Sequence, residues 1–404
     1  MSLAGLSSFQ DWAEYLTGLV NETVSKTAIW KRANKNLLAC VDSILKKAIN
    51  SQLEPHKINI KKEGSLSHFT RVLLQDSTTI QLPNLLAQFY KGNTSKGKQK
   101  SVLRIQLVHD LLTGGFQTFS LSSFTENDQG AAPDILKIIR QGDLVIRDLG
   151  YFVIKVFKNI AAAGGFFLTR FKYGCHIYSP VTGEKIELID LLKGNMVDVN
   201  ILLGAKEKFG CRMIAVKVPE KVANERRRKA KNDRDKRLNH SKEYMELLGW
   251  AIFFTNVKSD TWDYKTVIQI YKIRWHIEII FKGWKSHFNI DKLIPEIPKK
   301  GKIKNEDIER YKIRVETVIY MVLIYITLFH LYFYINFLWK IYNCKRIVIS
   351  YLKVFSFVKK HIHRIISSHD WQQFEKELIY FTAYEKRNKR ENHLDLYLKL
   401  ITNG

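Results

Sequence analysis

Cysteine is scarce in this chain, and its pattern excludes several kinds of protein. The four cysteines stand alone at Cys40, Cys175, Cys211 and Cys344, and no C-x-x-C pair occurs. We therefore expect neither a cysteine-based zinc site nor a disulfide framework, and a reducing cytoplasm fits this usage. The first residues contain no basic region followed by an apolar run, so no signal peptide is expected. No internal repeat is present either.

Acidic residues are few relative to basic ones. The chain has 39 Asp and Glu against 65 Lys and Arg, a formal net charge of +26. Such an excess favours a polyanionic partner, with nucleic acid first and a membrane surface second. Hydrophobic residues make up 46% of the 404 residues. The chain can therefore bury the core of one large domain or of two to three smaller ones, and disorder is not expected.

One long apolar run, residues 318–339, is long enough to cross a bilayer. It also contains His330, Asn336 and several tyrosines. A buried helix in a large protein has the same composition. We interpret the run as a buried helix and expect no membrane association, with a basic membrane-associated protein as a distant alternative.

Two aspartates lie at the carboxyl-terminal ends of segments that have the sequence pattern of strands. Asp76 lies near the end of the first such segment, and Asp148 follows a short apolar run. Three strands, a helix and a further strand that leads into an aspartate are typical of the opening of a ribonuclease-H-like fold. Strands are expected at residues 70–80, 102–107, 116–124 and 143–146, with a short helix at 133–140 and a polar turn or loop at 91–100.

Residues 271–285 have the pattern of an amphipathic helix. On a continuous helix, one stripe is built for burial and the opposite stripe carries a single carboxylate among basic groups. The alternative is a ladder of surface ion pairs on a solvated face. The apolar stripe consists of Ile273, Ile277, Ile280 and Trp284. The polar stripe consists of Tyr271, Arg274, Glu278, Lys282 and Lys285.

Between the second aspartate and this helix, residues 165–261 are predicted to form a β-rich insertion. Strands are expected at 166–177, 185–192, 211–218 and 250–255. Within the insertion, residues 224–240 are densely basic and include Arg226, Arg227 and Arg228. This run is either a solvated arm or a segment that contacts DNA phosphates, and the sequence favours neither.

Three carboxylates far apart in sequence suit two-metal phosphodiester chemistry. Asp76, Asp148 and Glu278 would together bind a pair of Mg²⁺ ions, with Mn²⁺ as a substitute, because magnesium prefers hard oxygen ligands. No histidines with a convincing ligand spacing compete for this role. Asp110 and Asp134 are rival acids, but the first is expected in a turn and the second at a helix start.

These residues carry a resemblance to a known family. The order Tyr271, two residues, Arg274, three residues, Glu278, six residues, Lys285 resembles the signature of DDE transposases of the insertion-sequence-four family. The blocks 75–83 and 147–151 resemble the two aspartate motifs of that family. Gly249-Trp250 and Thr255-Asn256 are similar to its segment before the signature. The resemblance covers about residues 65–290.

The resemblance implies a catalytic triad of Asp76, Asp148 and Glu278. It implies cut-and-paste transposition: hydrolysis at the element's end, a hairpin made by the freed 3′-hydroxyl, hairpin opening, and strand transfer into target DNA. By the same resemblance Trp250 would stack on a flipped base. Tyr271, Arg274 and Lys285, with Lys282 beside them, would hold the terminal phosphates. Trp250 is alternatively a plain tryptophan of the β core.

The expected organisation has four parts. A ribonuclease-H-like core, a mixed sheet with flanking helices, covers 66–164 and 262–310, and the β-rich insertion covers 165–261. By family analogy, the helical residues 1–65 would bind the inverted repeats of double-stranded DNA, and the helical residues 311–404 would form a homodimer. Two alternatives remain: a metal-dependent nuclease of the same fold that does not join DNA, and a non-catalytic, DNA-binding remnant of a transposase.

Overall fold

The computed structural model describes residues 9–53, 64–95, 97–232, 240–288, 290, 294, 304–361, 364 and 370–384. These residues form two compact units. Unit 1 contains the described parts of 1–60, 76–126 and 275–395, and unit 2 contains those of 61–75 and 127–274. The predicted organisation in four parts stays a prediction.

Unit 2 contains a mixed sheet that begins with parallel strands. Strand β1 (Val72–Leu82) starts in this unit, and its first four residues pair in parallel with β5 (Leu144–Arg147). Strand β6 (Phe166–Arg170) is parallel to β5. All four residues of β5 are buried, as expected for a strand that is covered on both faces.

The predicted β-rich insertion continues this sheet with antiparallel strands. Strand β11 (Trp250–Thr255) pairs with β6, and β10 (Phe209–Lys217) pairs with β11. Strand β9 (Met196–Leu203) then follows β10, with the short β7 (Ile177–Tyr178) and β8 (Lys185–Ile186) at the edge. The sequence did not predict β9, because polar side chains interrupt its apolar residues.

Unit 1 contains the continuation of β1, which neighbours β3 (Lys98–Asp110). Strands β2 (Lys91–Ser95) and β4 (Phe116–Ser123) both pair antiparallel with β3. Residues 91–100, expected to be a loop, are therefore largely a hairpin. The hairpin is largely exposed and polar, so its sequence lacks the apolar alternation that would have indicated strands. The strand succession, with β1 beside both β3 and β5, confirms the predicted ribonuclease-H-like mixed sheet with flanking helices.

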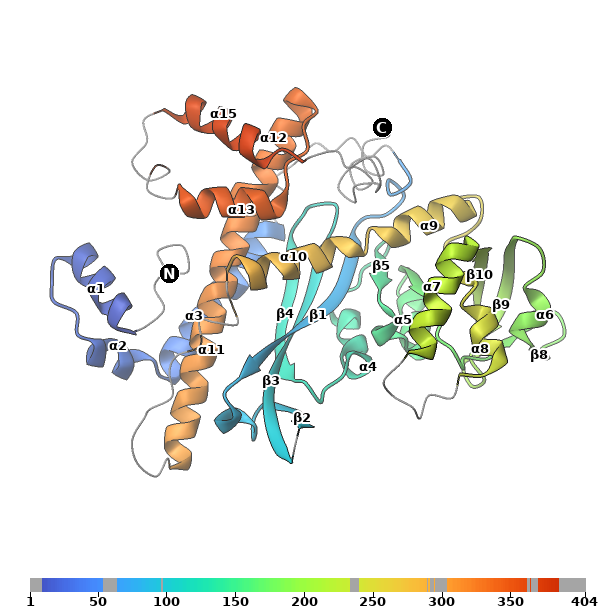
Figure 1. Cartoon of the computed structure of the whole chain (residues 1–404), viewed down its shortest axis with the longest axis horizontal. Coiled ribbons are helices and arrows are strands. Elements are labelled where there is room, and N and C mark those ends of the chain that lie inside the picture. The colour runs from blue at the N-terminus through green and yellow to red at the C-terminus, as the bar shows by residue number, and fades with distance from the viewer. Residues whose placement is uncertain are drawn as a thin grey trace. The chain divides into compact units, whose positions relative to one another are not determined.

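Helices cover the sheets within each unit. In unit 1, α10 (Trp275–Ser286) lies across β4 (Figure 1), where Trp284 contacts Phe116 and Phe119 at ring-centroid distances of 6.1 and 5.8 Å. The other helices of unit 1 are α1 (Phe9–Val20), α2 (Lys26–Arg32), α3 (Lys35–Leu53), η1 (Asn84–Leu86), α11 (Asn305–Leu328), η4 (Phe329–Ile335), α12 (Asn336–Lys345), α13 (Tyr351–Lys360) and α15 (Trp371–Thr382). Those of unit 2 are α4 (Asp128–Ala131), η2 (Ala132–Lys137), η3 (Leu149–Tyr151), α5 (Ile154–Ala162), α6 (Leu188–Leu191), α7 (Glu220–Lys231), α8 (Lys242–Leu247) and α9 (Tyr264–Lys272).

The long apolar run is part of one helical segment that includes α11, η4 and α12. It is long and apolar enough to cross a membrane, and 65% of its most apolar window is buried within the protein. His330 and Tyr334 are fully buried, and the ring of His330 bonds to the carbonyl of Gly114 at 2.9 Å. This burial is what the interpretation as a core helix predicts.

Candidate active site

The signature residues are divided between two helices, so the prediction of one continuous helix is wrong. Helix α9 ends at Lys272, and α10 begins at Trp275. Between them, the N–H groups of Ile273 and Arg274 bond to carbonyls three residues back instead of four, which interrupts the α-helical ladder. The apolar face is confirmed, because all of its residues are at most 1% exposed: Ile273, Ile277, Ile280 and Trp284.

Two of the three predicted acids line one pocket in unit 1. Asp76 on β1 and Glu278 on α10 face a pocket of about 500 Å³. The exposed lysines Lys282 and Lys285 line the same pocket. A carboxylate oxygen of Asp76 accepts the backbone N–H of Ser77 at 2.8 Å. The pocket therefore combines metal-binding oxygens with cations that suit an anionic backbone.

The sequence predicted Asp76 near the end of a strand, but Asp76 lies inside β1. The strand continues to Leu82, because it is rich in β-branched residues after Asp76 and neighbours β3. Its parallel pairing with β5 stops at the pair Gln75 and Arg147. Asp76 and Asp148 follow these two partners directly in the sequence. Each acid therefore comes one residue after the last pair of this parallel pairing.

The third acid, Asp148, is held in unit 2 by signature residues. The Nε atom of Arg274 lies 3.7 Å from Oδ1 of Asp148. The hydroxyl of Tyr271 donates to the carbonyl oxygen of Arg147 at 3.4 Å, and its ring packs on Phe253 at 5.2 Å. Burial raises the pKa of Tyr271 to about 12, and the charge of Asp148 contributes to the rise. Tyr271 is therefore a neutral donor at physiological pH.

The three predicted acids offer the type of ligand atom that a magnesium ion prefers. Asp76 and Glu278 offer carboxylate oxygens in an open pocket, and the carboxylate of Asp148 is 46% exposed; oxygens of this type are the ligands that Mg²⁺ prefers. Within the described part of the chain, no three His, Cys, Asp or Glu side chains are grouped closely enough to hold one metal ion. The convergence of all three acids on one site stays a prediction.

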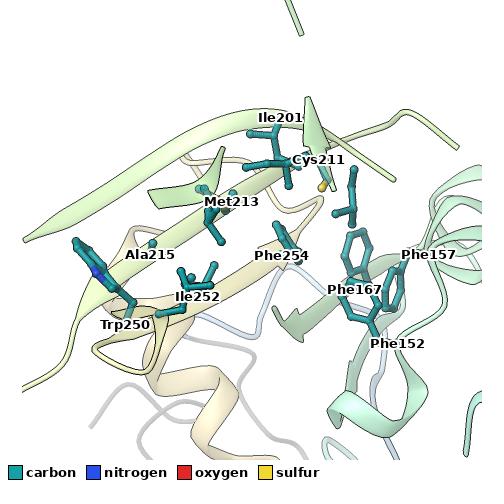
Figure 2. Close-up of a cluster of buried hydrophobic side chains, with 14 residues drawn as sticks. Phe152, Phe157, Phe167, Ile201, Cys211, Met213, Ala215, Trp250, Ile252 and Phe254 are labelled. Carbon is teal, nitrogen blue, oxygen red and sulfur yellow. The ribbon is translucent and has the colours of Figure 1, made fainter. Parts of the chain in front are cut away.

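Trp250 lies in a hydrophobic core, where Figure 2 shows it near Met213, Ala215 and Ile252. Its side chain is 8% exposed. A base could stack on this ring only after the ring had left the core. The geometry therefore favours the alternative that the sequence left open, a tryptophan of the β core.

The basic run 224–240 begins in a helix rather than in an extended arm. Residues 220–231 form α7, while 233–239 lie outside the described residues. Arg226 donates to the carbonyls of Leu248 and Trp250 at 3.3 and 3.0 Å, and Arg227 donates to that of Met245 at 3.1 Å. These two arginines fasten α7 to its own unit. Three other basic residues in the described part of this run are exposed: Arg228, Lys229 and Lys231.

Some residues near the acids were not singled out from the sequence. Ser77 lines the pocket of Asp76 and accepts a hydrogen bond of 2.8 Å from the buried Arg104. A buried arginine on a strand is not distinguishable by pattern from an exposed one. The rival acids have structural roles. Asp110 caps a turn through Leu112 N and the Thr113 hydroxyl, and the exposed Asp134 pairs with Lys137 at 2.7 Å.

Comparison with known proteins adds independent information. A family model described as a transposase DDE domain matches residues 67–296. The transposase of insertion sequence element IS231B from Bacillus thuringiensis subsp. berliner is 30% identical over 247 residues, covering 56% of this chain and 52% of that protein. The transposase of IS1151 from Clostridium perfringens is 27% identical over 296 residues, covering 68% of this chain and 62% of that protein.

The chain thus spans about half the length of the first of these relatives, 52% of it. Among solved structures, a piggyBac transposase synaptic complex with hairpin DNA aligns with 80% of this chain and 59% of its own, at 7% identity and a TM-score of 0.33.

Proposed function

This chain belongs to the DDE transposase family, of the insertion-sequence-four-like kind, and on that premise we propose that it catalyses the cut-and-paste movement of an insertion sequence. One observation carries the proposal. Asp76 and Glu278, brought together from a strand and a distant helix, share one pocket with Lys282 and Lys285. Acids and cations in one open pocket suit the cleavage of a phosphodiester.

In this proposal Asp76, Asp148 and Glu278 hold Mg²⁺, for which Mn²⁺ can substitute. The bound metal would supply activation of the attacking oxygen and stabilisation of the leaving oxygen. Lys282 and Lys285 attract the DNA backbone to the pocket, because their ammonium groups are exposed point charges. The substrate is double-stranded DNA: the terminal inverted repeats of the element, and then a target. The protein acts on it as a homodimer.

The test uses purified protein, the inverted repeats that flank its own gene, and Mg²⁺. We expect cleavage at the repeat ends, hairpin intermediates and joining to a second duplex. Glu278→Gln removes a carboxylate charge with little change in shape. It should leave DNA affinity nearly unchanged and abolish cleavage with Mg²⁺ and with Mn²⁺. Glu309→Gln, at an exposed position of α11 outside the pocket, is the matched control and should cleave normally.

Three outcomes would reject the proposal. Cleavage by the Glu278→Gln variant would remove this residue from the catalytic set. Cleavage by the unaltered protein without any joining product would identify a nuclease of the same fold instead of a transposase. DNA binding without cleavage under all metal conditions would identify a non-catalytic remnant.

A further inference from the structure

The carboxylate of Asp148 already has a cation beside it. Arg274 lies at the junction of α9 and α10, and its side chain is 12% exposed, whereas that of Asp148 is 46% exposed. The Nε atom of Arg274 lies 3.7 Å from Oδ1 of Asp148. An arginine remains protonated at any physiological pH. Only movement of the side chain, and not loss of a proton, can therefore release Asp148 from this charge.

A second signature residue fixes the backbone at the same point. The hydroxyl of Tyr271 donates to the carbonyl oxygen of Arg147, the residue before Asp148. Two residues separate Tyr271 from Arg274, and the pair contacts two consecutive residues, Arg147 at the end of β5 and Asp148 after it. Tyr271 and Arg274 thus contact the end of β5 and the acid that follows it, although both would be expected to contact phosphates in the DNA complex.

We propose that Arg274 is the internal counter-ion of Asp148 in the metal-free and DNA-free protein, and that a divalent cation must displace it to bind this carboxylate. The inference rests on the proposed function and deepens it. A guanidinium and a divalent cation repel each other when both adjoin one carboxylate. The planar guanidinium, once displaced, matches a phosphate as well as it matches a carboxylate. Arg274 is a positioning residue in this scheme.

The displacement links metal binding to DNA binding. Metal at Asp148 frees Arg274 for a phosphate, and a phosphate that holds Arg274 leaves Asp148 open to metal. By thermodynamic linkage, each ligand then raises the affinity for the other by the same factor. The pair therefore disfavours metal loading, and with it adventitious cleavage chemistry, until a DNA backbone is in place.

The first test measures Mn²⁺ affinity of the full-length, DNA-free protein from the electron paramagnetic resonance signal of free Mn²⁺. Arg274→Gln should bind Mn²⁺ roughly two- to fivefold more tightly, the range expected for a partly exposed ion pair. Arg170→Gln is the control, because Arg170 is an exposed cation whose charge also acts on Tyr271. In an Asp148→Asn background, Arg274→Gln should give no gain.

A second test observes the side chain of Arg274 directly. In protein labelled with ¹⁵N-arginine, the Nε–H signal of Arg274 is identified by its absence in Arg274→Lys. Asp148→Asn and saturating Mg²⁺ should each shift this signal. An equal gain in Arg170→Gln, a gain that persists in Asp148→Asn, or a signal that Mg²⁺ leaves unchanged would each overturn the inference. If the protein cleaves DNA but shows none of these effects, only this inference is rejected. If it shows these effects but does not cleave DNA, the proposed function is rejected.

Discussion

The exposed basic residues of α7 allow a quantitative test of how the protein meets DNA. Arg228, Lys229 and Lys231 are exposed, whereas Arg226 is half-buried and donates to two backbone carbonyls. We predict that only the exposed set contacts phosphates. Replacing all three with Ala should preserve the helix, because alanine has the highest helix propensity. Binding to every duplex should weaken alike, since phosphate contacts carry no sequence information.

The expected magnitude follows from counterion release. Each phosphate contact contributes about 0.9 to the slope of log affinity against log salt, so the loss of three contacts lowers the slope by up to about 2.7. Between 50 and 200 mM salt, this difference corresponds to about a 40-fold smaller loss of affinity. Fluorescence anisotropy with an unrelated duplex, at a series of KCl concentrations, measures the slope for the triple variant and for the unaltered protein.

The control for this experiment is Arg226→Ala. It removes one positive charge from the same helix but also the hydrogen bonds to Leu248 and Trp250. We expect an unchanged salt slope together with a loss of about 1–3 kcal/mol of unfolding free energy, because two partly buried acceptors lose their donor. An unchanged slope in the triple variant would refute the reasoning and make α7 a solvated helix. A lowered slope in Arg226→Ala would show that its guanidinium leaves the carbonyls to meet DNA.

Three further predictions concern buried side chains. Trp250→Ala should cost about 3–5 kcal/mol of stability in chemical denaturation, so that nicking and hairpin formation fall together; a stable variant that loses only the hairpin step would restore the base-stacking role. Arg147→Met should stabilise the protein by about 1–3 kcal/mol in a urea titration. Burial lowers the pKa of this arginine to about 9, and its guanidinium has no hydrogen-bond partner in the described structure. A destabilised variant would contradict this prediction. Burial also lowers the pKa of His330 to about 4. The unfolded chain therefore binds more protons than the folded one between about pH 6.5 and 4. As the pH falls through this window, the free energy of unfolding should fall by about 3 kcal/mol. His330→Gln, which can still donate to Gly114, should flatten this pH dependence, and an equally steep profile in the variant would refute the assignment.

Much of the site could be predicted from the sequence, because its signals are local. The spacing of Tyr271, Arg274, Glu278 and Lys285 indicated the family, which the match over residues 67–296 confirms. The 3.6-residue period identified the buried face of α10, and the run of apolar residues before Asp148 identified β5. Period and burial are properties of neighbouring residues, so a single sequence carries them.

Other features depend on contacts between distant segments, and only the tertiary structure decided them. The junction at Ile273 divides the signature, so that Tyr271 and Arg274 act at Asp148 while Glu278 shares a pocket with Asp76. The sequence around Trp250 is equally compatible with base stacking and with core packing, and its neighbours in the buried cluster favour packing. The sequence pattern of a charged side chain on a helix is the same whether the side chain contacts DNA or backbone carbonyls of the same protein. Which carbonyls lie within 3 Å of Arg226 is set by how α7 packs on β11, and that packing is not written in any local pattern.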